Sequence, residues 1–291
     1  MQIRSLHIRI IVFFMILLFT VQGVLYFVVT ASGQRIAERT IGDELAIGER
    51  VFRRLVDQRS GQLAAAAQVL AADFGFRTAV ATSDAETIAS ALANHGNRIQ
   101  ANVVMLASLD GSLTAAVGAE GMRGMHFPLP ALLEVAREKG KAAAIVLLEG
   151  RPYQIVMVPV LAPVPIAWVA MGFTLDDRVA SDLQSVSTLH VSFLSRAADG
   201  RWSLHASTLP APLRASLLGH GAALADISRA TTMGLDGEDY QSLLPVLGET
   251  PEGRVVALLQ RSRREALAPF DQVRTILTVL ALVSIGLSVV G

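Results

Sequence analysis

The chain has 291 residues, of which 52% are hydrophobic and only 17% are charged. Soluble domains carry roughly 25% charged residues, so the composition excludes an ordinary cytosolic protein. The formal net charge is zero and there is no cysteine. The charge balance argues against a nucleic-acid-binding protein, and the lack of thiols excludes a disulfide scaffold, a zinc–thiolate site and a cysteine nucleophile.

Residues 10–34 form the first apolar segment and contain no charged side chain. About 20 apolar residues cross the hydrocarbon layer as a helix, and Arg4 and Arg9 precede the segment. The positive-inside rule therefore predicts a cytoplasmic N-terminus at residues 1–9 and a transmembrane helix at residues 10–34. A cleaved signal peptide is the alternative, and the length of the segment disfavours it.

Residues 275–291 form the second apolar segment, directly after Arg274. We expect a second transmembrane helix here, truncated before its cytoplasmic flank. A hydrophobic tail that is removed for a lipid anchor is the alternative, but no small-residue site with a polar spacer precedes the segment. Two spans would place residues 35–274 outside the cytoplasm.

Residues 35–75 are predicted to form one long stalk helix. Small or apolar residues recur there at helical spacing, and Arg59 lies inside the one long gap. The stripe consists of Ile41, Leu45, Gly48, Phe52, Leu55, Leu63, Ala66 and Leu70. This spacing resembles a coiled-coil seam. The helix either packs along its own domain or also contacts a second copy of the chain, and the pattern leaves both open.

Residues 76–175 are predicted to form a small α+β domain. The dipeptide Asp110-Gly111 is a strong hairpin signal between two strand-like runs. A helix and three further strands follow, separated by Gly- and Pro-containing turns. The order predicts a five-stranded antiparallel sheet, with helices at 84–96 and 131–139 and strands at 101–108, 112–117, 142–148, 153–161 and 166–173.

Residues 176–261 repeat this order in weaker form, so we predict a second domain of the same architecture stacked on the first. An exit helix at residues 262–274 then leads into the second apolar segment. The expected helices lie at 176–188 and 211–218, and the expected strands lie near 191–195, 202–205, 227–233, 239–247 and 254–260.

No catalytic motif is found in the sequence. The tripeptide Glu265-Ala266-Leu267 spells EAL, but a nucleotide-cleaving site needs several carboxylates gathered around metal ions, so we interpret it as a coincidence. No two of the six histidines have the spacing that places two ligands on one helix face. We therefore expect no enzymatic activity, no cofactor and no metal site in this chain. An extracytoplasmic enzyme is a weaker alternative, for which no acid–base pair can be named.

A ligand of the first domain is expected on the concave face of its sheet, beneath the Gly- and Met-rich loop at 118–128. Arg could pair a carboxylate, and Tyr and Trp supply apolar walls with polar tips. Burial in the core is the alternative for the Trp and Met candidates. The candidate ligand-binding residues are Arg151, Tyr153, Gln154, Trp168 and Met171 on the strands, and His126 over the mouth.

The order of span, long helix, two PAS-like sheets and span resembles the double Cache sensor domains of bacterial transmembrane receptors. Residues 70–106, residues 153–173 and the heptapeptide GEDYQSL at 237–243 are similar to one double Cache subfamily. The resemblance covers nearly the whole chain and assigns no ligand residue. It makes residues 76–175 the membrane-distal and residues 176–261 the membrane-proximal Cache domain.

The resemblance implies the ligand-sensing input region of a two-span receptor in the bacterial inner membrane, with residues 35–274 in the periplasm. Its partners would be an unknown small molecule, membrane lipid and a second copy of the chain, bound through the long helix and the spans. Cytoplasmic domains that make or hydrolyse cyclic-di-GMP are the expected output. The alternatives are a sensor histidine kinase, a chemoreceptor, or a membrane-tethered binding protein without catalytic output.

Overall fold

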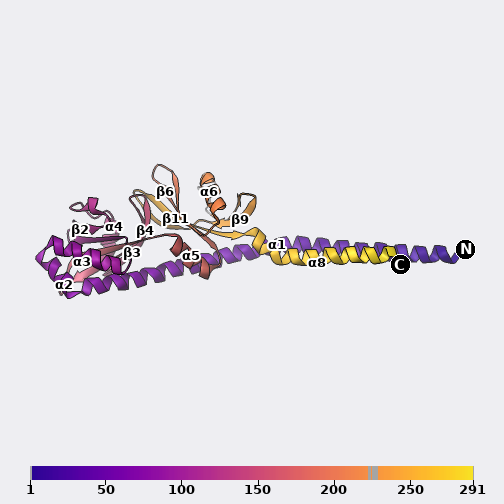
Figure 1. Cartoon of the computed structure of the whole chain (residues 1–291), viewed down its shortest axis with the longest axis horizontal. Coiled ribbons are helices and arrows are strands. Elements are labelled where there is room, and N and C mark those ends of the chain that lie inside the picture. Colours follow the sequence, from indigo (N-terminus) through magenta and orange to yellow (C-terminus); the bar gives the residue numbers. More distant parts are fainter. Residues whose placement is uncertain (1, 222–223, 225–228, 291) are drawn as a thin grey trace. The chain divides into compact units, whose positions relative to one another are not determined.

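The computed structural model describes residues 2–221, 224 and 229–290, and Figure 1 shows their helices and strands. The chain divides into two compact units. The larger unit contains Ile47–Arg229 and Leu243–Gln260, and the smaller contains Met1–Ala46, Ala230–Ser242 and Arg261–Gly291.

The long helix α1 (Gln2–Ala72) has 71 residues and contains residues 35–72 of the stalk predicted at 35–75. It ends at Asp73, whose backbone is extended and whose carboxylate accepts a hydrogen bond of 2.8 Å from the Phe76 backbone N–H. Asp is a favoured N-cap residue, so this side chain ends one helix and starts the next, α2 (Phe74–Thr82). The sequence pattern does not predict α2, because nine residues with a glycine and two threonines have low helix propensity.

The first sheet lies in the larger unit and has the strand order β2-β1-β5-β4-β3. All four neighbouring pairs are antiparallel, so the predicted five-stranded antiparallel sheet is confirmed. Gly111, with a φ of +91°, makes the predicted turn of the first hairpin possible. The strands are β1 (Val103–Ser108), β2 (Leu113–Val117), β3 (Ala142–Leu148), β4 (Arg151–Leu161) and β5 (Pro165–Thr174).

The two faces of the first sheet are covered by different elements. One face packs against α1, α2 and α3 (Ala85–Arg98). The other packs against α4 (Pro130–Lys139) and the loop that contains the short 3-10 helix η1 (Glu120–Met122). Because strand side chains alternate between faces, position along a strand decides which of these two layers a residue joins.

Four strands of the second sheet lie in the larger unit, connected to the first sheet by α5 (Asp177–Ser187). β6 pairs with both β7 and β11, β10 pairs with β11, and all these pairs are antiparallel. The helix α6 (Ala211–Gly219) follows β7. The strands are β6 (His190–Ala197), β7 (Trp202–Ser207), β10 (Val246–Thr250) and β11 (Gly253–Ser262).

β10 packs directly against β3 and so joins the two sheets. A Cβ atom on Gly248 would lie 1.7 Å from the Ile145 carbonyl oxygen, so only glycine fits there. The Thr250 hydroxyl donates to the Leu147 carbonyl at 3.3 Å, and the Gly150 N–H donates to the Glu252 carboxylate at 3.3 Å. The two predicted sheets are confirmed, and the predicted stacking of two domains stays a prediction.

The smaller unit contains the first part of α1, the hairpin of β8 (Thr231–Leu235) and β9 (Glu238–Leu243), and α8 (Arg263–Val290). The strand predicted at 239–247 is instead two strands, because Pro245 has no N–H to donate and separates β9 from β10. Of the strand predicted at 227–233, residues 227 and 228 lie outside the described residues. α8 runs continuously over the predicted exit helix and second apolar segment.

Among the residues whose side chains are described, no single helix has both the length and the hydropathy of a membrane span. Thr40–Ala72 and Phe74–Thr82, bent by 66°, meet the length and composition test only as a pair, and Ile16–Val28 is a shorter apolar helix.

Candidate ligand-binding site

The six residues predicted to bind a ligand do not lie on one face. Trp168 and Tyr153 belong to the sheet face covered by α4 and the η1 loop. Met171 belongs to the opposite face, with α1, α2 and α3. Trp168 and Met171 are three positions apart on one strand, and an odd separation places two side chains on opposite faces. Trp168 and Tyr153 therefore share one face of the sheet, six positions apart along the β4–β5 pair, and Met171 lies on the other face.

Gln154 also faces α1. Its side-chain amide donates to the Val56 carbonyl at 3.1 Å and to the Ser60 hydroxyl at 2.7 Å, and the residue is 1% exposed. A buried amide needs such partners, because an unpaired one costs about 1–3 kcal/mol. Gln154 thus connects β4 to α1.

Trp168 is the most informative of the predicted residues. It is 4% exposed and pairs across the sheet with Ala107 and Pro159. Its indole N–H is buried and donates to no acceptor among the described residues. Buried indole N–H groups usually have a hydrogen-bond partner. The indole N–H of Trp168 is therefore, among the described residues, an unsatisfied donor within an otherwise apolar layer. Tyr153, on the same face, is 8% exposed.

His126 and Arg151 are exposed at the edges of this region. His126 forms an isolated antiparallel bridge with Ser112, which attaches the η1 loop to the first hairpin. Arg151 begins β4 and lies near His205 of β7. Burial lowers the pKa of His205, the charge of Arg151 lowers it further, and the ring Nε2 lies 2.7 Å from the Ser195 hydroxyl oxygen.

A cleft of about 580 Å³ lies between α1 and α5, on the face of the first sheet that packs against α1, α2 and α3. No pattern in the sequence predicted this cleft. Its charged lining comes from Arg59 on α1 and from Asp176, Arg178 and Asp182 at α5. Burial lowers the pKa of Arg59, while the charges of Asp176 and Asp182 raise it and that of Arg178 lowers it. The one signal in the sequence was the arginine inside an otherwise apolar helical stripe.

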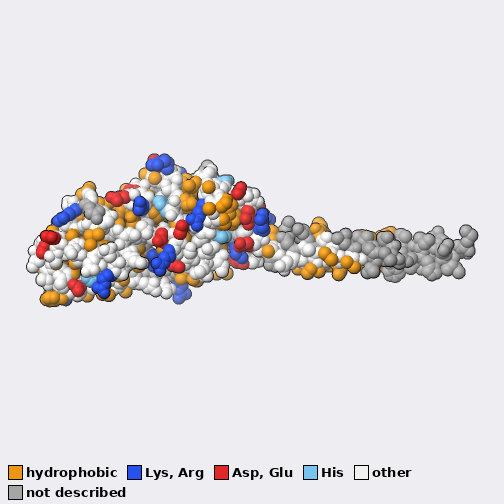
Figure 2. Space-filling view, viewed as in Figure 1, with side chains coloured by type: hydrophobic (Ala, Val, Ile, Leu, Met, Phe, Trp, Pro, Cys, Tyr) orange, Lys and Arg blue, Asp and Glu red, His pale blue; other side chains and the backbone are white. Residues whose placement is uncertain are grey.

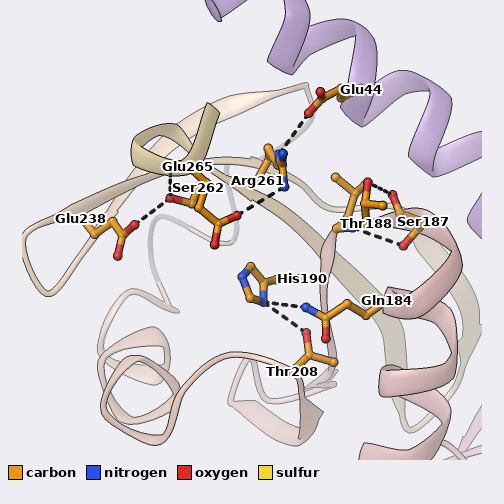
Figure 3. A network of polar contacts seen from close by, with 11 residues as sticks. Glu44, Gln184, Ser187, Thr188, His190, Thr208, Glu238, Arg261, Ser262 and Glu265 are labelled. Carbon is orange, nitrogen blue, oxygen red and sulfur yellow. Dashed lines mark hydrogen bonds and ion pairs between the residues drawn. The ribbon is translucent and has the colours of Figure 1, made fainter. Parts of the chain in front are cut away.

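Figure 3 shows polar contacts in the two units. In the smaller unit, Arg261 donates to Glu44 of α1 at 3.0 Å and to Glu265 of α8 at 3.3 Å. The Ser262 hydroxyl donates to Glu238 at 2.7 Å and accepts from the Glu265 N–H at 3.1 Å. Arg261 thus connects the long first helix to the beginning of the last one.

In the larger unit, Figure 3 draws the contacts of His190 and those between Ser187 and Thr188 at the end of α5. The Nδ1 of His190 lies 3.1 Å from the side-chain nitrogen of Gln184 and 3.4 Å from the Thr208 hydroxyl oxygen. These bonds attach the end of α5 to the second sheet. No three His, Asp or Glu side chains of the described part of the chain gather to form a metal site.

A family model described as a double sensory domain of two-component sensor kinases (dCache_3) matches residues 38–289. The chain belongs to this double Cache family. Cache domains are extracytoplasmic sensor domains of membrane receptors, and they are sensory rather than catalytic by themselves. The resemblance noted in the sequence is thereby confirmed. On the face that Figure 2 shows, acidic and basic side chains of the double Cache region are intermixed.

The double Cache chain is also similar to solved structures at low identity. The periplasmic domain of Vibrio cholerae LuxQ is 12% identical, with a TM-score of 0.49, covering 75% of this chain and 99% of that one. The ligand-binding domain of the Pseudomonas fluorescens chemoreceptor CtaA, in complex with L-isoleucine, is 13% identical, with a TM-score of 0.45 and coverage of 82% and 97%. A domain of a sensory box/GGDEF family protein from Vibrio parahaemolyticus is 10% identical, with a TM-score of 0.46 and coverage of 80% and 99%. No curated protein matches.

Proposed function

We propose that the chain is the ligand-sensing input region of a two-span receptor of the bacterial inner membrane. The observation that carries this proposal is the double Cache match over residues 38–289, together with the uncharged segments at 10–34 and 275–291. All the acidic residues, and all the basic residues except Arg4 and Arg9, lie between these two segments. Arg4 and Arg9 before the first segment support a cytoplasmic N-terminus, and two spans would then place the middle of the chain in the periplasm.

Reporter fusions test this topology. Alkaline phosphatase inserted at Gly150, in the exposed turn before β4, is expected to be active, and a cytoplasmic reporter inserted there is expected to be inactive. The same reporters joined to the N-terminus should give the reverse result. An active cytoplasmic reporter at Gly150, or a mature protein that begins after residue 31, would contradict the proposal.

The proposed ligand site is the face of the first sheet beneath the η1 loop. Trp168 and Tyr153 lie on this face, and the buried indole N–H of Trp168 offers a donor that no described side chain uses. His126 lies in the loop above them. A small ligand with an acceptor for the indole N–H suits this arrangement. Arg151, Gln154 and Met171 lie elsewhere and are left out of the proposed site.

A thermal-shift screen of the full chain in detergent against amino acids, organic acids and polyamines tests the site, because a ligand that binds only the folded state raises the melting temperature. Trp168→Phe, which removes the N–H and keeps an aromatic ring, is expected to reduce the shift. Trp202→Phe is the matched control on the second sheet. Equal shifts in both variants would exclude Trp168 from the site.

We propose that the signal is a change in packing between α1 and α8. A ligand moves such an equilibrium only by its difference in affinity for the two states, and a shift from 1:99 to 99:1 needs about 5.5 kcal/mol. The contact of Arg261 with Glu44 and Glu265 supports a connection between these helices.

The proposed dimer forms through α1. Ile47 and Val69 are 52% and 69% exposed, and about six helical turns separate them, so both lie on one face of the helix. A single cysteine at Val69 is expected to crosslink two chains, and a cysteine at the exposed Arg53, which lies on a different face of the helix, provides the comparison. Absence of crosslinks at Val69 and Ile47 would exclude this dimer face.

For the output, the description of the matched family favours a two-component sensor kinase. Cyclic-di-GMP synthesis or hydrolysis, which the sequence resemblance implied, stays a prediction. An activity assay on membranes that contain the full-length protein distinguishes these two outputs. A kinase transfers the γ-phosphoryl group of ATP to its own histidine, whereas a cyclase converts two GTP molecules to cyclic-di-GMP with release of pyrophosphate.

A further inference from the structure

The cleft between α1 and α5 is separate from the face that carries Trp168. Its walls come from α1, from the segment between α3 and β1, from the end of β5 and from α5. Phe173, which lines it, belongs to the opposite sheet face from Trp168. Its volume of about 580 Å³ is within the range of roughly 300–1,000 Å³ that small-molecule sites occupy.

Arg59 places a guanidinium group in this cleft that has no hydrogen-bond partner among the described residues. The side chain is half-buried, and its guanidinium forms no hydrogen bond or ion pair with any residue that the structure describes. A buried charge is costly unless it is paired. The planar guanidinium matches a carboxylate with two parallel hydrogen bonds. Arg59 is therefore suited to bind a carboxylate that enters the cleft.

Two acidic side chains lie on the α5 wall of the cleft. One oxygen of Asp176 caps α5 by accepting from the Val179 N–H at 3.0 Å. The carboxylate of Asp182 accepts no hydrogen bond from the described residues, and the residue is exposed. Together with Arg59 and Arg178, the cleft carries equal numbers of positive and negative side chains. A ligand with both a carboxylate and an ammonium group matches this distribution.

Asn102 adds a neutral donor. Its amide oxygen accepts from the Thr174 N–H at 2.9 Å and from the Thr174 hydroxyl at 3.1 Å. This arrangement holds the side chain in place and leaves its NH₂ group as a donor for a second acceptor on the ligand.

We propose that this cleft is a second ligand site and that it binds an α-amino acid. The carboxylate of the amino acid binds Arg59, and its ammonium group faces Asp182. The inference goes beyond the proposed function, since it does not require ligand binding beneath the η1 loop. An amino acid bound here contacts both α1 and α5, and α5 leads directly into the second sheet.

Isothermal titration of the full chain in detergent micelles tests the site. The probes are the standard amino acids, each compared with the acid that lacks its amino group and the amine that lacks its carboxylate. At least one amino acid is expected to bind saturably and more tightly than either analogue. Arg59→Gln is expected to weaken that binding about 10- to 100-fold, the effect of losing charge-assisted hydrogen bonds.

Three further variants sharpen the result. Arg54→Gln, an exposed arginine on the same helix that does not line the cleft, is expected to bind as the wild type does. Arg59→Lys keeps the charge but loses the two-bond geometry, so its affinity should be intermediate. Asp182→Asn should weaken binding of the amino acid and leave binding of the deaminated acid unchanged.

The outcomes separate this site from the one beneath the η1 loop. Weaker binding in Arg59→Gln with unchanged binding in Trp168→Phe supports the cleft. The reverse pattern overturns the cleft assignment and supports the proposed function. If no amino acid binds the wild type, or if Arg59→Gln binds as the wild type does while its circular dichroism is unchanged, the cleft proposal is wrong.

Discussion

Trp168 and Met171 show how far single residues could be assigned from the sequence. Both were recognised as candidates, and both lie in the predicted strand. Which face is covered by the η1 loop depends on the pairing of β5 with β1 and β4, and local sequence does not contain that information. Arg59 was missed for a related reason. An arginine in an apolar stripe was visible, but the residues of α5 that face it are more than a hundred positions away.

Asp110 in the first hairpin gives a prediction at this scale. Hydrogen bonds from the Ser108 hydroxyl, and then from the Ser112 N–H and hydroxyl, lower the pKa of Asp110 from 3.8 to about 2. Ser108→Ala is expected to raise this pKa towards its ordinary value, and Ser112→Ala should raise it less, because the Ser112 N–H remains. The carboxyl carbon chemical shift of Asp110, followed by NMR from pH 5 to pH 2, measures both.

The sign of the pH effect follows from this shift. A carboxyl whose pKa is lower in the folded chain than in the unfolded chain stabilises the fold at every pH above its unfolded-state pKa. That contribution is lost as the pH falls through its folded-state pKa. In Ser108→Ala this contribution should be smaller, and its loss should be complete at a higher pH than in the wild type. Identical titration curves would contradict the hydrogen-bond assignment.

His205 gives a second prediction for a residue. Burial, and then the charge of Arg151, lowers its pKa, so the unfolded chain binds a proton at a higher pH than the folded chain does. Stability is therefore expected to fall as the pH falls below about 6.5. Arg151→Gln should raise the pKa of His205 in part, because burial remains, and should reduce the loss of stability.

Urea unfolding at pH 7.5 and pH 5.5, with NMR titration of the imidazole, measures the His205 effect. Arg201→Gln is the control, since Arg201 pairs with Asp199 and does not act on His205. An unchanged pKa of His205 in Arg151→Gln would contradict the prediction.

Elements were predicted well where local chemistry determines them. Asp110-Gly111 marked the first hairpin, and Asp84 marked the start of α3, where its carboxylate accepts from the Glu86 and Thr87 N–H groups. Predictions failed where the contacts are tertiary. α2 is stabilised by Phe76 and Ala79 packed against the first sheet rather than by propensity. The break between β9 and β10 at Pro245, by contrast, is a local feature that the prediction of one strand at 239–247 overlooked.

Two glycines of α1 give a matched prediction for an element. A Cβ on Gly48 would lie 2.3 Å from Leu189 Cδ1, whereas a Cβ on Gly61 would meet nothing within 4 Å. Gly61→Ala is expected to stabilise the fold by about 0.5–1 kcal/mol, because alanine has the higher helix propensity. Gly48→Ala should destabilise it by about 1–3 kcal/mol through overpacking.

Urea unfolding of the full chain measures the effect of both glycine substitutions. The double variant Gly48→Ala/Leu189→Ala tests the cause, since a smaller side chain at 189 removes the overlap and should give a favourable interaction energy in the double-mutant cycle. If Gly48→Ala stabilises the chain as much as Gly61→Ala does, the close approach of α1 to Leu189 is absent in solution.

For the whole molecule, the repeated order of hairpin, helix and three strands predicted two sheets, and the family match over residues 38–289 agrees with it. The domain boundaries drawn from the sequence stay predictions. The ligand and the output domain have no signature in this chain, because binding specificity depends on a few side chains brought together by the fold, and output depends on other domains.

The Glu44–Arg261 pair gives a prediction at this scale. It joins α1 to the start of α8 with an N–O distance of 3.0 Å, and Arg261 is 23% exposed. Glu44→Gln is expected to broaden the distance distribution between spin labels on cysteines introduced at Asp43 and Arg264. The chain has no native cysteine, so these are the only labelled sites.

Glu49→Gln is the control for this measurement, because Glu49 pairs with Arg53 within α1. It should leave the label distances unchanged. An unaltered distribution in Glu44→Gln would mean that the ion pair does not hold the two helices together.

The unbroken course of α1 from Gln2 to Ala72 has a consequence for how such chains can diverge. Each residue turns an α-helix by about 100° and lengthens it by about 1.5 Å. Loss or gain of one residue before Ile47 would therefore rotate every earlier side chain to a new azimuth, while seven residues, close to two full turns, would restore the original phase. Insertions of seven residues are therefore compatible with the packing of α1, whereas insertions of one or two residues are not.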